Sequence, residues 1–473
     1  MASFVYRFAR DLRVDDHAGL AAAAAFGEIL PTLIVDNALH ARLARSPRRA
    51  AFYCRAVRAL DAALRERGSR LIVRRGAPGR ALRNLARAGG ASGVAWSASY
   101  HGGGAHHDKH LQSDIEEAGL RAVLVHDAPA IPPEETSAAY SGTGGGYRAF
   151  VPYLATWREL EPHSFEQPLL MRFAASDLQS EALPHPAEFG AVDHEFDATP
   201  SHAQGLLRRF LEHDGLHYAM AANVPADDRT SHLSAHLTFG TISARAVVRA
   251  VLTRMQDPFL LVEERASLRF FLRSMALRDF FLQLAWYHPL TDDAPLQERM
   301  REFTFARSHP ALDAWRAGTT GFPLVDAGVR QLRATGWMHP RVRAVAASFL
   351  CFDLGVDWRI GRDEWERYLI EDDPALSTGN WQWIAGIGAD MAQYPRIYNP
   401  QTQRRRFDPS GAYVQRWVAE LAHRPMGAWS AASAHAQIEL PLFAGRTYPQ
   451  PVLDHEREAR AFLDRYRAHH AGS

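Results

Sequence analysis

Short apolar runs alternate with amphipathic segments over about the first 130 residues. One amphipathic segment, Arg48–Arg67, repeats its apolar positions at helical spacing. The apolar runs predict five strands, at Phe4–Phe8, Ile29–Val35, Leu71–Val73, Val94–Trp96 and Ala122–Val125. Because strands that alternate with helices form parallel sheets covered on both faces, the pattern predicts an α/β domain with a parallel, doubly wound sheet. Such sheets bind small molecules at the carboxyl ends of their strands.

The periodicity changes after Asp127. Several prolines and the glycine run Gly144–Gly146 predict an irregular connection, and residues 161–203 have only weak periodicity. From Gly205 onward most segments have helical spacing, most clearly Leu206–Tyr218, Ala244–Met255, Leu260–Tyr287, Val325–Thr335 and Arg341–Leu354. The pattern therefore predicts an α/β domain over residues 1–128, a connector over 129–204 and a larger all-α domain over 205–473.

The composition agrees with more than one domain, because 473 residues exceed what one hydrophobic core usually holds. The 11 tryptophans and 24 phenylalanines suit a large core or a stacking site for a planar ligand. A formal charge of +1 gives no general attraction to nucleic acid, so DNA binding would need a local basic patch. The arginines that would form such a patch, or else a solvated charged face, are Arg307, Arg316, Arg333, Arg341 and Arg404–Arg406.

The sequence also bears on the compartment. Cys54 and Cys351 fall in different predicted domains, so we expect no structural disulfide and a reducing environment. The first residues lack the apolar run of a signal peptide, and no window has the apolar length that spans a bilayer. We therefore expect a cytoplasmic protein with no membrane partner. His106 and His110 have the i, i+4 spacing of metal ligands, but no cysteine is near and we expect no metal site.

Two constellations in the helical half suit an anionic ligand. The hydroxyls of Tyr218 and of the segment Thr230, Ser231, His232, Leu233 and Ser234 precede a predicted helix. Such hydroxyls, with free backbone N–H groups, can donate to a phosphate, although a simple N-cap has the same composition. Arg278 lies within the strongly apolar segment Phe270–Phe281. An unpaired buried charge is costly, so Arg278 needs a carboxylate or a ligand phosphate as its partner.

A third constellation extends from Gly336 to Asn399. Arginines precede a run of acidic residues, which in turn precedes two tryptophans; the residues are Arg341, Arg343, Glu371, Asp372, Asp373, Trp381 and Trp383. A buried arginine–carboxylate pair beside several indoles is unusual for a plain core. It is suited to holding a polar, planar, redox-active ring.

Several multi-residue motifs occur in a consistent order along the chain. They are Arg10–Arg13 with Asp15 and Asp16, Gly146–Tyr153, Thr319–Ala327, Gly336–His339, Gly379–Trp383 and Arg396–Pro400. Over nearly the whole chain these segments resemble the cryptochrome/photolyase family. Multi-residue matches at consistent spacing are far more specific than a single glycine pattern.

The resemblance implies an N-terminal α/β domain, a helical domain that binds FAD, electron transfer driven by blue light, and a monomer. It implies that Arg343 pairs with Glu371 near the isoalloxazine ring, and that Ser377 approaches flavin N5. Trp381 and Trp358 match the first two tryptophans of the family's electron relay to the excited flavin. The cofactor-binding set implied in this way is Tyr218, Thr230, Ser231, Leu233, Ser234, Arg278, Arg343, Glu371, Asp372, Asp373 and Ser377.

The substrate pocket departs from the family pattern. Where pyrimidine-dimer photolyases carry Glu and Trp on one helix, this chain has Ser274 and Leu277. Their Asn and Met four residues apart become Pro340 and Ala344, where (6-4) photolyases have two histidines. Neither repair pattern is met, although Trp383 remains as a possible wall of the pocket.

Other positions differ as well. The third tryptophan of the relay aligns with Phe305, whose ring is much harder to oxidise. Gly103 and Gly104 replace the Asn and Glu that contact a folate antenna, so the identity of any second chromophore stays open. We are left with a light-driven lyase acting on damaged pyrimidines in DNA, with a blue-light photoreceptor whose signalling partner is unknown, and with a flavoenzyme for another small substrate. A family member that binds FAD only structurally is the remaining alternative.

Overall fold

The structure is a computed structural model that describes residues 3–101, 103–138, 145–165, 171–191, 196–371, 373–389, 394–429 and 448–471. Its N-terminal part holds one parallel sheet in the strand order β3-β2-β1-β4-β5. The strands are β1 (Ser3–Phe8), β2 (Glu28–Val35), β3 (Ile72–Arg75), β4 (Ala91–Ser97) and β5 (Arg121–Val125). In the register of the sheet Val5 pairs with Leu30 on one side and with Val94 on the other. All five predicted strands are confirmed.

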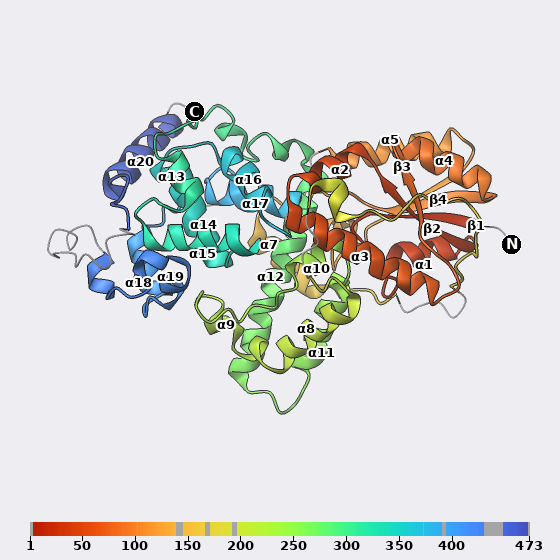
Figure 1. Cartoon of the computed structure of the whole chain (residues 1–473), viewed down its shortest axis with the longest axis horizontal. Helices are drawn as coiled ribbons and strands as arrows, with labels where there is room; N and C mark the ends of the chain where they lie inside the picture. Colours follow the sequence, from red (N-terminus) through yellow and green to blue (C-terminus); the bar gives the residue numbers. More distant parts are fainter. Residues whose placement is uncertain are drawn as a thin grey trace. The chain divides into compact units, whose positions relative to one another are not determined.

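Helices cover both faces of this sheet, as Figure 1 shows for the labelled strands and helices. Successive side chains of a strand point to opposite faces. Tyr6 and Phe8 of β1 therefore join one core cluster, together with helices α1 (Ala18–Ala24) and α3 (Pro47–Arg65). Val5 joins the opposite cluster, with the helices α4 (Pro78–Ala88) and α5 (Gly104–Glu116). The predicted doubly wound α/β fold is confirmed.

The chain forms two compact units. Unit 1 comprises Met1–Tyr218, Ser231–Asp292 and Ile370–Leu376, and unit 2 comprises Ala219–Thr230, Asp293–Leu369 and Ser377–Ser473. Part of the predicted connector belongs to unit 1, where the Ser180 hydroxyl accepts a hydrogen bond of 2.9 Å from the backbone N–H of Val73 on β3. Phe173 likewise bridges to Ile29 on β2. The domain boundaries at 128/129 and 204/205 stay predictions.

After β5 the ordered elements are almost all helical. The longest is α12 (Val262–Tyr287), and 14 of its 26 residues are buried, so it is a core helix of unit 1. The other helices up to this point are α2 (Asn37–Ala44), α6 (Pro133–Ala138), α7 (Phe150–Glu159), α8 (Pro200–Glu212), α9 (Tyr218–Ala221), α10 (Ser234–Phe239) and α11 (Ala244–Met255). Those that follow are α13 (Leu312–Ala317), α14 (Pro323–Thr335), α15 (Pro340–Ser348), α16 (Trp358–Glu366), α17 (Pro374–Ile384), α18 (Pro400–Phe407), α19 (Ala412–Trp417) and α20 (His455–Ala471).

Two predicted helices end earlier than expected. The segment Arg341–Leu354 is divided, because α15 ends at Ser348 and a π-helical turn spans Phe349–Asp353. In that turn the N–H of Leu354 bonds to the carbonyl of Phe349, five residues back. The helix predicted over Leu206–Tyr218 ends at Glu212 and is followed by a short 3₁₀ turn.

The core of unit 2 is rich in large aromatic rings, among them the fully buried Trp315, Trp358 and Phe349. Both cysteines, Cys54 in unit 1 and Cys351 in unit 2, are buried free thiols, as expected. Across the described residues, none of the helices combines the length and apolar character that crossing a bilayer requires.

Candidate functional site

A cluster of buried polar side chains lies at the carboxyl edge of the sheet, where β1 and β4 are neighbours and the strand order reverses. Asp11, just after β1, accepts hydrogen bonds from the hydroxyls of Tyr6 (2.5 Å) and Ser97 (2.6 Å). Burial raises the pKa of Tyr6 well above its ordinary value, and the carboxylates of Asp11 and Asp127 raise it further. Tyr6 is therefore a neutral donor to Asp11.

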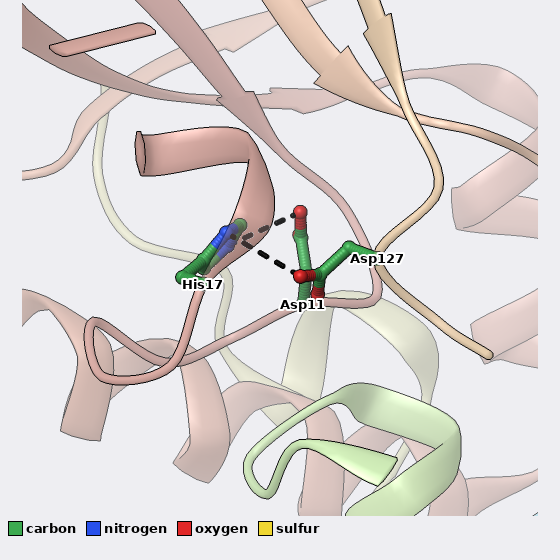
Figure 2. Close-up of side chains that lie close together, drawn as sticks. All are labelled: Asp11, His17 and Asp127. Carbon is green, nitrogen blue, oxygen red and sulfur yellow. Dashed lines mark ion pairs between the residues drawn. The ribbon is translucent and has the colours of Figure 1, made fainter. Parts of the chain in front are cut away.

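Figure 2 shows the ring of His17 facing the carboxylates of both Asp11 and Asp127. The Nδ1 atom of His17 accepts a bond from the N–H of Leu20 at 3.2 Å. The Nε2 atom of the same ring lies 3.4 Å from Asp11 Oδ2. Burial alone would raise the pKa of Asp11, but the bond from His17 and its charge outweigh burial and lower this pKa.

Two arginines form ion pairs with the carboxylate of Asp127. Arg13 and Arg245 each reach Asp127 at 2.7 Å, and all three side chains are almost fully buried. Burial would raise the pKa of Asp127, but Arg13, His17 and Arg245 together hold it far below its ordinary value. Asp127 is thus an ionised centre that ties the loops after β1 and β5 to α11 within unit 1.

Asp11, His17 and Asp127 have ligand atoms close enough together to surround one metal ion. However, Asp127 already receives the two guanidinium groups, and Asp11 receives two hydroxyls and the N–H of Ala9. A cation would have to displace these donors and lie beside two fixed positive charges. The cluster is suited to an internal ion-pair network rather than to a metal centre. Sequence reasoning missed it, although charged residues directly after apolar strands were a visible signal.

Arg278 lies on α12 in unit 1, where its side chain is 9% exposed. It donates to the carbonyls of Ala128 (2.8 Å) and Leu237 (3.3 Å), and its carboxylate contact is Asp279 at 3.4 Å. Asp279 in turn accepts three N–H bonds through its other oxygen. Asp279 is therefore shared between Arg278 and these three N–H donors.

Asp373 precedes α17 and is also in unit 1. Its carboxylate accepts a bond from the Ala375 N–H (3.1 Å) and forms an ion pair with Arg10 (3.0 Å). Burial would raise its pKa, but Arg10, Arg278 and Arg42 outweigh burial and lower the pKa below its ordinary value. Three arginines thus act on this one carboxylate. Arg10 belongs to the Arg10–Arg13 motif, but its pairing with Asp373 was not predicted.

The hydroxyl segment before α10 has an unusual backbone. Asp228 and His232 have positive φ angles of 45° and 53°, a conformation that side chains disfavour by about 1–3 kcal/mol each. The hydroxyl of Ser231 accepts a bond from the N–H of Leu233 at 3.4 Å. Leu233 occupies the N-cap position and makes no side-chain cap, so the simple N-cap interpretation is wrong for α10. Thr230 belongs to unit 2, whereas Ser231 and Ser234 belong to unit 1.

Tyr218 stands at the end of the first segment of unit 1, where its ring contacts those of Phe210, Phe270 and Phe271. Glu371 is 9% exposed, and its carbonyl accepts a bond from the Thr238 hydroxyl. Glu371 is in unit 1 and Arg343 in unit 2, so their implied pairing stays a prediction. Asp372 lies outside the described residues.

In unit 2 the helix α15 carries two of the implied pocket positions. Pro340 is exposed and Ala344 is half-buried. His339 caps the helix, since its Nδ1 accepts the N–H of Arg341 at 3.2 Å. Burial, with Arg343 and Arg341 nearby, lowers the pKa of His339 to about 4, so the ring is neutral near pH 7. Arg343 donates to the carbonyl of Met338 at 2.7 Å.

The other pocket positions divide between the units. Ser274 is exposed and Leu277 is half-buried, and both lie on α12 in unit 1. Trp383 is half-buried in unit 2, on α17.

The predicted relay residues also lie in unit 2. Trp381 on α17 is 4% exposed, and Trp358 at the start of α16 is 1% exposed. Ser377, on α17 with Trp381, is half-buried. Phe305, which takes the place of the third tryptophan, is 9% exposed and contacts Phe303 and Phe462.

The arginines proposed for a basic patch separate into two groups within unit 2. Arg341 on α15 and Arg406 on α18 both lie over the ring of Phe407, at 4.9 and 5.2 Å. Arg333 instead donates to the carbonyl of Arg316, on α13. In the first group, arginines of α18 lie beside α15. Arg404, which is also on α18, lies over Trp429 at 5.6 Å.

Comparisons with known proteins agree with these features. Residues 4–169 match the family described as DNA photolyase, and residues 271–468 match the FAD binding domain of DNA photolyase. A deoxyribodipyrimidine photo-lyase of Halobacterium salinarum is 33% identical, and the match covers 97% of this chain and 98% of that protein. A bacterial class III photolyase from Agrobacterium tumefaciens is 30% identical with a TM-score of 0.84, over 100% of this chain and 98% of its own. A Synechocystis cryptochrome shares the fold at 24% identity and a TM-score of 0.84, over 99% of each chain.

An N-terminal α/β sheet followed by a helical FAD-binding region defines a flavoprotein. More narrowly, the chain belongs to the cryptochrome/photolyase family.

Proposed function

We propose that this flavoprotein uses blue light to transfer an electron to pyrimidine dimers in DNA. FAD, when bound, supplies the light absorption and the one-electron chemistry. The proposal is supported by relatives named as photo-lyases that match along the whole chain, Halobacterium salinarum and Streptomyces griseus among them. What the protein contributes is binding of the cofactor, a path for electrons and a surface for DNA.

The charge distribution of unit 1 fits a diphosphate. Arg278, Arg10 and Arg42 all act on the carboxylate of Asp373, and Arg278 also lies 3.4 Å from the carboxylate of Asp279. A cluster of guanidinium groups is suited to binding an anionic ligand. The residues proposed to hold FAD are Tyr218, Thr230, Ser231, Leu233, Ser234, Arg278, Arg343, Glu371, Asp372, Asp373 and Ser377.

One observation carries the proposal of DNA binding. Arg341 and Arg406 are 65 positions apart in sequence, yet both lie over Phe407. Arg341 follows Pro340 on α15, so this basic group adjoins an implied pocket position. Asn223 accepts two bonds from Arg341, at 3.0 and 2.5 Å. In this proposal Arg341 and Arg406 contact the phosphates of the DNA backbone.

The test is repair of oligonucleotides that contain either a cyclobutane dimer or a (6-4) product, under blue light and in darkness. We expect light-dependent loss of one lesion by the purified FAD-loaded protein. R406Q should weaken DNA binding by about three- to tenfold and lower the salt dependence by about one counterion. R467Q, which changes an arginine at the far end of α20, is the matched control. If neither lesion is repaired, the lyase proposal is wrong.

The second candidate is a blue-light photoreceptor without repair activity. Ser274, Leu277, Pro340 and Ala344 lack the stacking and charged groups that hold a flipped dimer, and each lost base–aromatic stack is worth about 1–3 kcal/mol. Among the implied pocket residues, Trp383 still has an aromatic ring on which a base could stack. Light-driven reduction of the flavin without repair of either lesion favours the photoreceptor. A protein whose flavin stays oxidised in light with a thiol present would exclude both functions.

A further inference from the structure

One face of α16 carries two buried indoles on either side of a glycine. Trp358, Gly361 and Trp365 are spaced i, i+3 and i+7, so they share a face of the helix. A Cβ on Gly361 would lie 2.3 Å from the ring of Trp381, so the glycine lets α16 approach that ring closely. Trp381 is therefore packed against the turn of helix between Trp358 and Trp365.

Trp365 is in ring contact with Trp381. Their ring centroids are 4.6 Å apart with an interplanar angle of 55°. Trp365 in turn stacks on Trp315 of α13, at 6.0 Å and 14°. All three rings are buried, at 4%, 5% and 0% exposure. Rings in contact or stacked within a dry core give strong electronic coupling and little solvent reorganisation.

Trp358 has a different electrostatic setting. The guanidinium groups of Arg359 and Arg362 each lie 5.1 Å from the centroid of its ring. A cation over an indole is attracted to the neutral ring and repels a positive charge that develops on it. Asp357 and Asp363 pair with these arginines at 2.6 and 3.0 Å and offset part of the repulsion. Oxidation of Trp358 is still disfavoured relative to an indole with no cation above it.

The rings at the third relay position offer no alternative. Phe305 contacts Phe303 at 5.1 Å and Phe462 at 6.0 Å. Phenyl rings are much harder to oxidise than indoles, so a positive charge that reached Trp358 would have no oxidisable ring at this position to move to.

We propose that Trp365 and Trp315 form the productive electron path to Trp381 in this protein. The proposal rests on the proposed function, in which Trp381 is the first electron donor to light-excited FAD. Each step moves one electron towards the cofactor: Trp381 is refilled by Trp365, and Trp365 by Trp315. A small thiolate in solution then gives one electron to the oxidised Trp315 and becomes a thiyl radical. No covalent bond forms or breaks along the three indoles.

The hydrogen bonds of these indoles predict a spectroscopic signature. The Nε1–H of Trp315 donates to the carbonyl of Ala346 at 3.0 Å, and a carbonyl is not a base for this proton. The buried Nε1–H of Trp365 has no hydrogen-bond partner among the described atoms. An oxidised indole at either position should therefore keep its proton, and transient absorption should show the tryptophan cation radical rather than the deprotonated radical.

The experiment compares W365F, W315F and W358F in the FAD-loaded, full-length protein. After a blue flash, transient absorption measures the yield of long-lived tryptophan radical, and steady illumination with a thiol measures flavin reduction. We expect W365F and W315F to lower both by about tenfold or more, and W358F by about twofold to threefold. W417F, which changes an indole of α19 outside both paths, is the matched control. Flavin content and circular dichroism report folding.

The outcomes separate the two proposals. If W358F lowers the radical yield more than W365F does, the path through Trp365 is wrong. The same holds if W365F has the radical yield of the control W417F. Light-driven electron transfer stands in both cases. If the unaltered protein forms no radical and its flavin stays oxidised, the proposed function itself fails. Should W365F lose its flavin, W315F decides, because its ring lies one step further from Trp381.

Discussion

Two regions of the core of unit 2 differ mainly in the rings that they contain. One has the indoles Trp365 and Trp315, and the other has Trp358 followed by Phe305 and its phenyl neighbours. All of these rings except the half-buried Phe303 belong to one buried core cluster. Burial therefore does not distinguish the two regions. The two regions differ instead in the chemistry of their rings and in the charge near those rings. A hydropathy pattern reports neither property.

The charge effect is large enough to decide between the two regions. A unit charge about 5 Å from an oxidised ring raises its energy by about 3 kcal/mol at an effective dielectric constant of 20. Two guanidinium groups at this distance act on Trp358, and their acidic partners cancel part of the effect. Even one third of the uncancelled sum, about 2 kcal/mol, would favour Trp365 over Trp358 by more than tenfold.

Among changes near Trp358 and Phe305, the largest effect is expected from removing that charge. In the W365F background, R359Q combined with R362Q should raise the yield of tryptophan radical by about fivefold, because oxidation of Trp358 becomes easier. The measurement is the flash experiment at low ionic strength. The matched control is R359K with R362K, which keeps both positive charges and should leave the yield at the W365F level. Equal yields in the glutamine and lysine variants would show that charge does not separate the regions.

A smaller effect is expected from restoring the third indole. F305W alone should change the radical yield by less than about twofold, because the positive charge must still pass Trp358 beneath its two arginines. Phe305 is 9% exposed and packs among phenyl rings. The larger indole of F305W should therefore also lower the free energy of unfolding by about 1–3 kcal/mol. Flash absorption and urea denaturation measure the two quantities. A tenfold gain in yield from F305W would make the missing ring, and not the charge, the cause of the difference.

Most of the fold could be predicted from the sequence, because its signals are local. The five strands are short apolar runs, of which β1 and β2 are almost wholly buried, and α11 has the same bounds in the sequence pattern and in the structure. The prediction of one helix over Arg341–Leu354 was wrong at its end, because a π-helical turn begins at Phe349 without a break in the apolar spacing. A pattern of apolar positions does not distinguish two helix types that bury the same residues.

Less of the site could be predicted, because its contacts join distant segments. Trp381 and Trp358 were found through a motif, whereas the stacking of Trp365 on Trp315 joins residues fifty positions apart. The network of Asp11, His17 and Asp127 was missed for the same reason. The arginines over Trp358 could have been found, since Arg359 and Arg362 follow it at i+1 and i+4 on one helix.

The smallest effect on electron transfer is expected from substitution of Asp353, which belongs to the region of Phe305 and its phenyl neighbours. Asp353 follows Phe352, whose ring contacts Phe462 of α20 at 4.8 Å, and it pairs with His455 at the start of that helix. Its Oδ2 atom is buried with no hydrogen-bond partner among the described atoms. Burial raises the pKa of Asp353 from 3.8 to about 6; His455 opposes this shift and Glu458 adds to it.

The sign of the resulting pH dependence follows from linkage. Between pH 3.8 and about 6 the folded protein holds a proton on Asp353 that the unfolded chain has lost. The stabilisation from this group is therefore complete below pH 3.8 and is lost as pH rises through about 6. D353N should abolish this change, which amounts to about 2–3 kcal/mol, in urea denaturation followed from pH 4 to 7. Its radical yield should equal that of the unaltered protein, because neither Trp365 nor Trp315 depends on the docking of α20. A D353N protein that lost the radical signal would instead place the electron path on the phenyl side, against the proposal.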